Sequence, residues 1–237
     1  MVKVVLIGRG RLATNLLAAL QQAGHEVVSI NSRTLEGLPL EADAFIVAVK
    51  DSALEDVVRR ATKGREQQLF LHTAGSMPMS LFEGHTSRYG VFYPMQTFSK
   101  ERLVDFAEIP IFIEGADPAI RPLAESISRR VYELSTEARK YLHLSAVFAC
   151  NFVNHCYALS AELLEQHGLP FDVMLPLIDE TARKVHQLQP KDAQTGPAVR
   201  YDQNVISMQN QLLADQPEMQ QIYELMTKSI HQKAIER

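Results

Sequence analysis

Residues 2–20 read VKVVLIGRGRLATNLLAAL, and this stretch decides the fold. Its first six residues are apolar apart from one lysine and are rich in valine, which favours a buried strand. A turn with two glycines follows at once, and from Leu12 onward apolar residues recur with helical spacing. A strand, a glycine-rich turn and a helix in this order predict the first βα unit of a parallel sheet.

The turn has the pattern G-x-G-x-x-A, which runs from Gly8 to Ala13. Gly8 permits a tight turn, Gly10 lets a pyrophosphate approach the backbone, and Ala13 lets the helix pack closely on the sheet. The helix N-terminus offers unpaired N–H groups and a partial positive charge to phosphates. Between a strand and a helix this pattern predicts a dinucleotide site, and the alternative is a plain strand-to-helix turn.

The end of the second strand, Glu26–Ile30, bears on the choice of dinucleotide. The strand is followed by Asn31-Ser32-Arg33, which contains no carboxylate. NAD-specific domains usually carry Asp or Glu here for the ribose 2′-hydroxyl, and a carboxylate would repel a 2′-phosphate. Ser32 and Arg33 can instead donate hydrogen bonds to a phosphate, with further positive charge from Arg9 or Arg11. We therefore expect NADP as the cofactor; a solvated turn is the alternative.

Two other strands also end abruptly in small and polar residues, VKDS at 49–52 and HTAGS at 72–76. Ligands of parallel sheets bind at the carboxyl ends of the strands. The candidates for lining the cofactor or substrate here are Val49, Lys50, Thr73 and Ala74. Asp51 or Ser52 could equally cap the next helix. His72 could be a general acid or a hydrogen-bonded structural group.

The chain changes character near Glu137, because strand-like and helical patterns alternate before it and only helical patterns follow it. Strands are expected at 3–7, 26–30, 44–49, 69–72, 90–92 and 110–113, with helices at 12–23, 53–62 and 118–130. Later helices are expected at 138–167, 171–188, 197–213 and 218–234. These patterns predict an α/β protein with two domains. Residues 1–137 would form a Rossmann-type dinucleotide-binding domain on a parallel sheet, and residues 138–237 an all-helical substrate and dimerisation domain.

Composition excludes several classes of function. The chain has 237 residues, 22% of them charged, and a formal net charge of −4 with no block of like charge. This balance gives no support to nucleic-acid or membrane-surface binding, and no apolar run is long enough to span a membrane. The two cysteines, Cys150 and Cys156, have neither metal-ligand nor disulfide-framework spacing. We therefore expect no metal site and, without a recognisable leader, a cytoplasmic location.

The predicted helix 138–167 is apolar on most sides, so it must be buried in a core or against a partner. We expect a homodimer that forms through this helix. Counted at about 100° per residue, His143, Asn151 and Asn154 form a polar stripe along it. Buried polar groups need partners, and the stripe could bind a ligand or bridge neighbouring helices.

Five stretches carry a resemblance to a known family: LIGRGRLA at 6–13, NSRT at 31–34, YPMQTFS at 93–99, HLSAVFACN at 143–151 and TGPAVRYD at 195–202. Together they span nearly the whole chain. With them the chain resembles the Rossmann-domain enzymes with a helical C-terminal domain that include pyrroline-5-carboxylate reductase, ketopantoate reductase and deazaflavin-dependent NADP oxidoreductases. It is most similar to a bacterial subgroup of uncharacterised function that is labelled as NADP oxidoreductases.

The resemblance implies that the cofactor lies across Gly8–Leu12, with Asn31–Arg33 at the 2′-phosphate. It also implies that Thr195–Asp202 lies near the active site, in the same subunit or the partner. Ketopantoate reductase-like enzymes carry a lysine and then asparagines at four-residue steps, where this chain has His143, Val147 and Asn151. Relatives often have His-Pro where this chain has Tyr93-Pro94, so neither the acid nor the substrate carries over.

These observations predict an oxidoreductase that transfers hydride from NADPH to a small carbonyl or imine substrate. His143 is the expected general acid, because its ordinary pKa suits proton delivery at neutral pH, and Asn151 would orient the substrate. Weaker candidates for binding a polar or anionic group are Gln96, Thr97 and Arg200. The main alternative is an NADP-binding sensor or scaffold without turnover. Hydride exchange with a deazaflavin is a third possibility.

Overall fold

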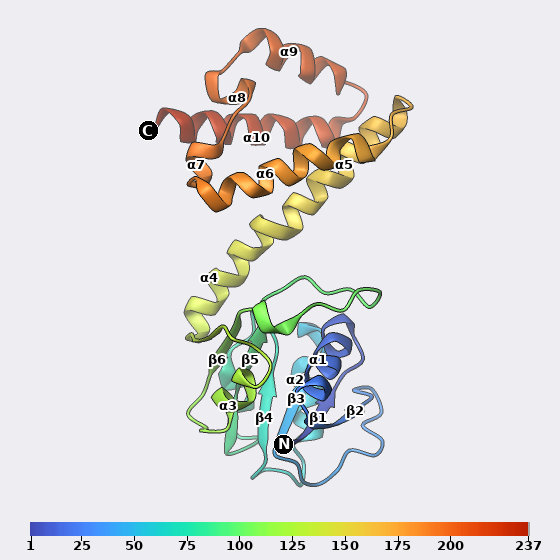
Figure 1. Ribbon diagram of the computed structural model, residues 1–237, viewed down its shortest axis with the longest axis vertical. Helices are drawn as coiled ribbons and strands as arrows, with labels where there is room; N and C mark the ends of the chain where they lie inside the picture. The colour runs from blue at the N-terminus through green and yellow to red at the C-terminus, as the bar shows by residue number, and fades with distance from the viewer. Residues whose placement is uncertain (237) are drawn as a thin grey trace. The chain divides into compact units, whose positions relative to one another are not determined.

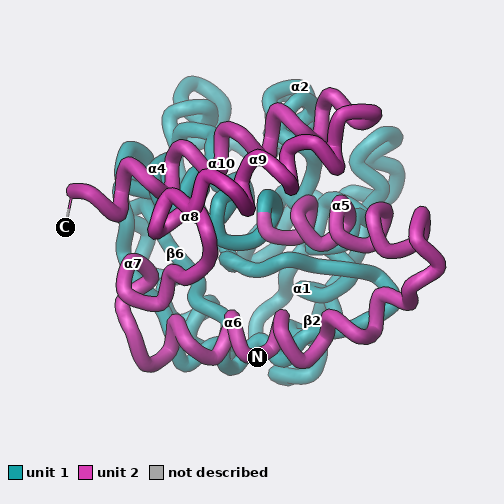
Figure 2. Tube along the Cα trace, turned by 90° about the horizontal axis from the view of Figure 1, so that it is seen from above, with its two compact units in different colours: residues 1–152 teal, residues 153–237 magenta. Residues whose placement is uncertain are grey.

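The computed structural model describes residues 1–236 (Figure 1). They divide into two compact units, Met1–Phe152 and the residues from Val153 onward (Figure 2). The predicted order of an α/β region followed by helices is confirmed, because the last described strand ends at Glu133. The two units divide inside the long helix, and the domain boundary expected near Glu137 stays a prediction.

The first unit contains a seven-stranded sheet with the order β2-β1-β3-β4-β5-β6-β7. Its strands are β1 (Lys3–Ile7), β2 (Glu26–Ile30), β3 (Ala44–Val47), β4 (Leu69–His72), β5 (Arg88–Pro94), β6 (Ile111–Glu114) and β7 (Val131–Glu133). The pairs from β2 through β5 are parallel, as expected for a Rossmann-type sheet. β6 is antiparallel to β5 and parallel to β7, so the last two strands run opposite to the rest. The expected Rossmann-type parallel sheet followed by a helical region is confirmed, with an edge formed by β6 and β7 that runs against the other strands.

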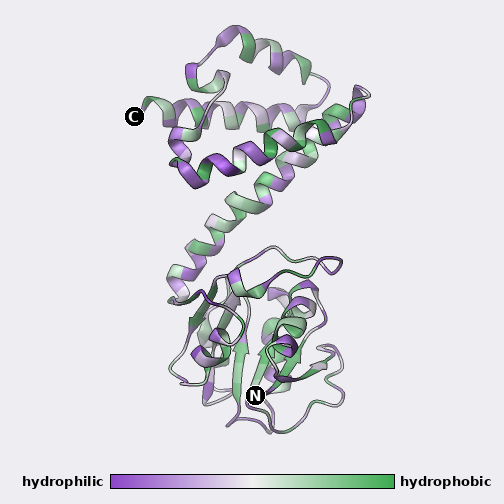
Figure 3. Ribbon diagram, in the orientation of Figure 1, coloured by the Kyte–Doolittle hydropathy of each residue, from purple (hydrophilic) through white to green (hydrophobic). Residues whose placement is uncertain are grey.

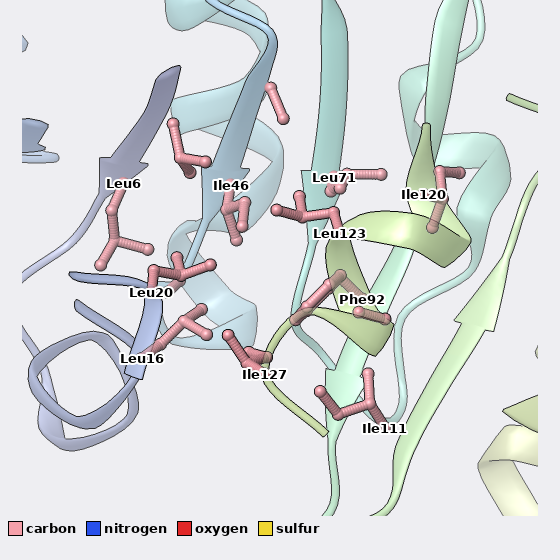
Figure 4. Close-up of a cluster of buried hydrophobic side chains, with 14 of the residues drawn as sticks. Leu6, Leu16, Leu20, Ile46, Leu71, Phe92, Ile111, Ile120, Leu123 and Ile127 are labelled. Atoms are coloured by element: carbon pink, nitrogen blue, oxygen red, sulfur yellow. The ribbon is translucent and has the colours of Figure 1, made fainter. Parts of the chain in front are cut away.

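Both faces of the sheet are covered, which explains why the central strands are continuous apolar runs. Strands are among the most apolar parts of the first unit (Figure 3). Val4 and Leu6 of β1 pack on one face with α1 (Arg11–Gln22) and α3 (Ile120–Glu125). Figure 4 shows this cluster. Val5 and Ile7 pack on the other face with α2 (Asp51–Ala61).

The predicted helix 138–167 is a continuous helical run with a change of winding in its middle. It consists of α4 (Thr136–Ala146), a π-helical stretch (Val147–Phe152) and α5 (Val153–Gln166). A π-helix bonds i to i+5 and therefore holds more residues per turn than an α-helix. The count of 100° per residue does not hold across this stretch, so the common face of His143 and Asn151 stays a prediction.

Within its described residues, the second unit consists of helices and the turns that join them. It contains α5, a 3₁₀ turn (Phe171–Met174), α6 (Leu175–Gln187), α7 (Pro190–Ala193), α8 (Pro197–Arg200), α9 (Gln203–Leu212) and α10 (Pro217–Ile235). The single helix expected over 197–213 is wrong, because Tyr201 adopts the left-handed conformation with φ of 52°. Asp202 then starts α9 by accepting a hydrogen bond from the Val205 amide. No helix within residues 1–236 is long and apolar enough to cross a membrane.

Candidate functional site

The glycine-rich turn after β1 lies between the ends of the two neighbouring strands. The Gly8 amide donates to the Ile30 carbonyl at 2.9 Å, and the Ala48 amide donates to the Ile7 carbonyl at 2.9 Å. Gly8 has φ of 138°, and a Cβ on it would lie 2.2 Å from the Ala48 carbonyl oxygen. Both the backbone conformation and the contact with the chain after β3 therefore require glycine here.

Gly10 is different, because no described atom outside its two chain neighbours comes within 4 Å of where its Cβ would be. Its φ is −79°, which other residues adopt freely. The protein's own packing thus does not require glycine at this position, whereas a phosphate approaching the backbone would. Gly10 precedes α1, and no side chain caps the start of that helix. The open space and the uncapped helix N-terminus fit the pyrophosphate of a dinucleotide.

The other residues of the motif fit the same group. Ala13 is buried and packs in the same cluster as Leu16 and Leu20, so a small residue does bring the helix close to the sheet. Arg9 and Arg11 are exposed on either side of Gly10, and Leu12 is half-buried. Two exposed arginines are therefore the chain neighbours of the residue that precedes α1.

The turn after β2 is held by a hydrogen bond within the turn and by hydrogen bonds from helix α2. Inside it, the Arg33 amide donates to Asn31 Oδ1 at 3.0 Å. From outside, Arg60 of α2 donates from Nη2 to the Ser32 carbonyl at 2.9 Å and from Nη1 to the Arg33 carbonyl at 3.1 Å. The pattern of residue types did not single out Arg60, because it binds backbone oxygens, which every residue carries.

The strand ends after β3 and β4 meet through a side-chain pair. Asp51 was expected as a possible helix cap, but it is the first residue of α2, and neither it nor Lys50 caps the helix with its side chain. The Asp51 carboxylate instead accepts a hydrogen bond from the Ser76 hydroxyl. Val49 is half-buried beside this pair and Lys50 is exposed.

The segment after β4 continues along the edge of β3. Thr73 is buried, and its amide donates to the Val47 carbonyl at 3.3 Å. Ala74 is also buried, and its amide donates to Nδ1 of His72 at 3.2 Å. Thr73 and Ala74 therefore lie at the carboxyl edge of the sheet, where ligands of such sheets bind.

His143 of α4 contacts this same edge. Its Nδ1 lies 3.0 Å from the phenol oxygen of Tyr93, near the end of β5. A Cβ on Gly75 would lie 2.6 Å from His143 Nδ1 and 3.0 Å from Tyr93 Cζ, so the glycine makes room for the pair. Burial raises the pKa of Tyr93, Arg139 partly offsets this, and Asp51 adds to it. Tyr93 thus keeps its proton at neutral pH and can donate it.

His72, the alternative acid, is fully buried and stacks on Phe82 with ring centroids 5.7 Å apart. Burial lowers the pKa of His72 to about 3, and the positive charge of Arg139 adds to the effect. His72 is therefore neutral at pH 7 and has no exposed atom from which to deliver a proton. Its environment is that of a structural histidine.

A buried arginine fixes α4 against the sheet one turn before His143. Arg139 has 1% of its side chain exposed and forms an ion pair with Glu114 of β6. It also donates from Nη2 to the Met77 carbonyl at 2.6 Å. Burial alone would raise the pKa of Glu114, but hydrogen bonds from Arg139 and Thr136 outweigh it and lower the pKa. We did not single out Arg139 from the sequence, although its spacing of four residues from His143 was a signal.

The remaining candidates are exposed. Gln96 and Thr97 follow β5, Asn151 lies in the π-helical stretch, and Arg200 ends α8 in the second unit. Within residues 1–152, none of the Gln96, Thr97 and Asn151 side chains hydrogen-bonds to the Tyr93–His143 pair. Over the same residues, no cluster of three or more His, Cys, Asp or Glu side chains could hold a metal ion.

Two family profiles match the chain. Residues 3–63 match the family described as "NADP oxidoreductase coenzyme F420-dependent", and residues 109–230 match a domain of unknown function, DUF2520. The comparison with curated proteins gives no match.

The crystal structure of the putative NADP oxidoreductase BF3122 from Bacteroides fragilis is similar over 98% of both chains, with 52% identity and a TM-score of 0.92. An imine reductase from Myxococcus stipitatus is similar over 98% of this chain and 93% of its own, with 15% identity and a TM-score of 0.60. The pyrroline carboxylate reductase of Plasmodium falciparum, solved with NADP bound, is similar over 98% of both chains, with 13% identity and a TM-score of 0.60.

The last two similarities show a common fold. The extent and identity of the first, together with the two profiles, show the family. The chain belongs to the NADP oxidoreductases in which a Rossmann-type domain precedes the DUF2520 domain, and NADP is its cofactor.

Proposed function

We propose that the protein reduces a small carbonyl or imine substrate with NADPH, and that His143 and Tyr93 deliver the proton. The observation that carries this proposal is the 3.0 Å contact between Tyr93 Oη and His143 Nδ1 at the carboxyl edge of the sheet. The glycine-rich turn that fits the cofactor follows β1, which is parallel to β4 and β5, so it belongs to the same edge.

The proton has a defined path within this pair. NADPH supplies the hydride that reduces the C=O or C=N carbon when it is bound. The oxygen or nitrogen of that bond then needs a proton. A protonated phenol in hydrogen-bond contact with an imidazole can give it, because a proton lost by one group can be replaced from the other. This makes Tyr93 a member of the candidate site alongside His143.

The substrate class rests on chemistry and on fold relatives. Reductases of imines and of pyrroline carboxylate have the same fold. Both names point to a C=N bond, which accepts hydride at carbon and a proton at nitrogen. A carboxylate near Tyr93, that of Asp51, would favour a substrate or product that carries positive charge. In this proposal Asn151 orients the substrate, and residues 138–237 supply the substrate and dimerisation domain.

We also propose that the active form is a homodimer. Only four residues beyond Val153 are buried among those described, namely Ala198, Leu213, Met219 and Thr227. A helical unit with so few buried residues is marginal on its own. Apolar side chains on α4 and the π-helical stretch, including Leu144, Phe148 and Phe152, are also exposed. A second copy that covers these side chains would supply the missing core.

The test is oxidation of NADPH by the pure protein against a panel of cyclic imines, keto acids and aldehydes, followed by the loss of NADPH absorbance. The panel should include a deazaflavin, since one family description names coenzyme F420. We expect turnover with at least one imine or carbonyl compound, and a kcat lower by roughly 10²–10⁴ in the His143→Ala variant. Tight NADPH binding without oxidation by any member would favour a sensor or scaffold and contradict the proposal.

A further inference from the structure

The turn after β2 is held by a residue that no sequence pattern assigns to the cofactor. We propose that Arg60 determines the preference for NADP over NAD, because it positions the Ser32–Arg33 turn that receives the 2′-phosphate. The inference rests on the proposal that this turn is the 2′-phosphate subsite. Arg60 would act through Ser32 and Arg33, so it is a positioning residue.

The contacts of Arg60 are specific and use most of its guanidinium. Nη2 and Nη1 donate to the carbonyls of Ser32 and Arg33 at 2.9 and 3.1 Å. Nε donates to Asp56 on the same helix at 2.9 Å. The side chain is 32% exposed and so lies along the surface of the unit. Within residues 1–236, Arg60 is the side chain outside residues 31–36 that hydrogen-bonds to the Ser32 and Arg33 backbone.

Two effects of these contacts favour a phosphate. A carbonyl oxygen carries partial negative charge, and an unpaired one at the end of a strand would repel an anion. Arg60 donates a hydrogen bond to each of these two carbonyl oxygens, so both oxygens are engaged by α2. The second effect is charge: Asp56 pairs with both Arg59 and Arg60, which leaves this cluster with one net positive charge. Hydrogen bonds from Arg59 and then Arg60 lower the pKa of Asp56, so the carboxylate stays ionised.

The planar guanidinium of arginine is required for these two contacts. Two parallel N–H groups can reach two successive carbonyls, whereas the single ammonium of lysine acts as a point charge. Inside the turn, the Arg33 amide is already bound to Asn31 Oδ1 at 3.0 Å. With both carbonyls held by Arg60, the two backbone oxygens that would repel an anion are engaged on the α2 side of the turn. The donor groups of the Ser32 and Arg33 side chains can then meet a phosphate without competing repulsion from these carbonyls.

The chain offers a matched control for the experiment. Arg59 also pairs with Asp56 at the surface of α2, and its guanidinium makes no hydrogen bond to the turn in the described residues. Arg59→Ala removes the same charge from the same helix and leaves the turn held. Arg60→Lys keeps the charge and removes the fork. Together the two variants separate charge from positioning.

Binding is measured by calorimetry on the full chain with four probes: NADP, NAD, 2′,5′-ADP and 5′-ADP. We expect Arg60→Ala to weaken NADP and 2′,5′-ADP by roughly tenfold, which corresponds to about 1.4 kcal/mol, and to leave NAD and 5′-ADP within twofold. Arg60→Lys should lose most of the same discrimination, and Arg59→Ala should keep it. The melting temperature of each variant checks that the fold is intact.

The outcomes distinguish this inference from the proposal beneath it. If the parent protein binds 2′,5′-ADP no better than 5′-ADP, and Arg33→Ala changes neither, the 2′-phosphate subsite itself is wrong. In a second outcome, the parent protein binds 2′,5′-ADP more tightly than 5′-ADP, and Arg33→Ala removes this preference. If Arg60→Ala then keeps the preference, only the role of Arg60 is overturned. Equal weakening of all four probes by Arg60→Ala, or full discrimination by Arg60→Lys, also overturns it.

Discussion

Tyr93 and His143 lie 50 residues apart in the chain, yet the phenol oxygen of one is 3.0 Å from Nδ1 of the other. Tyr93 is near the end of β5, and His143 is on α4, which Arg139 ties to the sheet. Gly75 leaves room for the contact, since a Cβ there would overlap the imidazole. Three segments thus converge on one pair of proton-carrying groups.

The first prediction concerns this pair. With an active substrate, His143→Ala should lower kcat by roughly 10²–10⁴, the usual contribution of general acid–base catalysis. Tyr93→Phe should lower kcat as well, and the double variant should lose little more than the worse single variant, because the two groups act as a unit. The dissociation constant of NADPH should stay nearly unchanged in all three.

Asn151→Ala provides the contrast, since an amide can hold a substrate but cannot give it a proton. We expect this variant to act mainly on KM, or equally on both constants if its contact tightens in the transition state. If both His143→Ala and Tyr93→Phe keep full kcat, the proton comes from bound water or another group. His72 is then a poor substitute, because it is buried and neutral.

Arg33 carries the second prediction. NADP should bind at least about tenfold more tightly than NAD, or about 1.4 kcal/mol, because the turn after β2 has no carboxylate and offers Ser32 and Arg33. Arg33→Ala should remove most of this difference by weakening NADP alone. The measurement is the dissociation constant of each cofactor. Equal dissociation constants for NADP and NAD in the parent protein would contradict this prediction.

The sequence predicts features that depend on local periodicity. β1, the glycine-rich turn and α1 were expected within one residue of their bounds, because strand and helix spacing both appear in one short stretch. β7 was missed because it has three residues, of which Tyr132 and Glu133 are exposed, so it leaves no apolar pattern. The break at Tyr201 was missed because a non-glycine residue in the left-handed conformation has no sequence signature.

The candidate site also combines features that can be predicted from the sequence with features that cannot. The glycine-rich turn could be predicted from residue types, because a strand, two glycines and a helix follow one another in one short stretch. The Tyr93–His143 contact could not, because it depends on how α4 meets the sheet. Arg60 could not either, since its partners are backbone carbonyls. Long-range contacts, and contacts with groups that every residue carries, leave no pattern in a single sequence.

The third prediction is a pH dependence of stability that originates at His72. Its pKa is about 3 in the folded protein and near 6.5 in an unfolded chain. Between these values the unfolded chain binds a proton that the folded protein does not. The free energy of unfolding should therefore fall as the pH is lowered from about 6.5 toward 3. His72→Gln should show a shallower fall in urea unfolding between pH 7 and pH 5; an equal slope in the two proteins would contradict this.

The fourth prediction is the homodimer. An interface of the obligate type should bury above about 2,000 Å² in total, and the protein should sediment as a dimer at micromolar concentration. Phe148→Glu should shift it toward monomer, because this side chain is 62% exposed on the apolar stretch that a second copy would cover. Leu40→Glu is the control, since Leu40 is 67% exposed in a loop of the α/β unit. A monomer in the parent protein would refute the proposal.

The last prediction compares the effects of an alanine at each of the two glycines of the turn. Gly8→Ala should destabilise the fold, because its Cβ would lie 2.2 Å from the Ala48 carbonyl oxygen at φ of 138°. Gly10→Ala should leave the melting temperature nearly unchanged, because no described atom beyond its two chain neighbours lies within 4 Å of the added Cβ. It should nevertheless weaken NADP, since the methyl group would occupy the space in front of the uncapped helix N-terminus. Thermal unfolding and calorimetric binding separate the two effects. If Gly10→Ala binds NADP as tightly as the parent protein, the pyrophosphate does not approach the backbone at this turn, and the assignment of the site to Gly8–Leu12 is wrong.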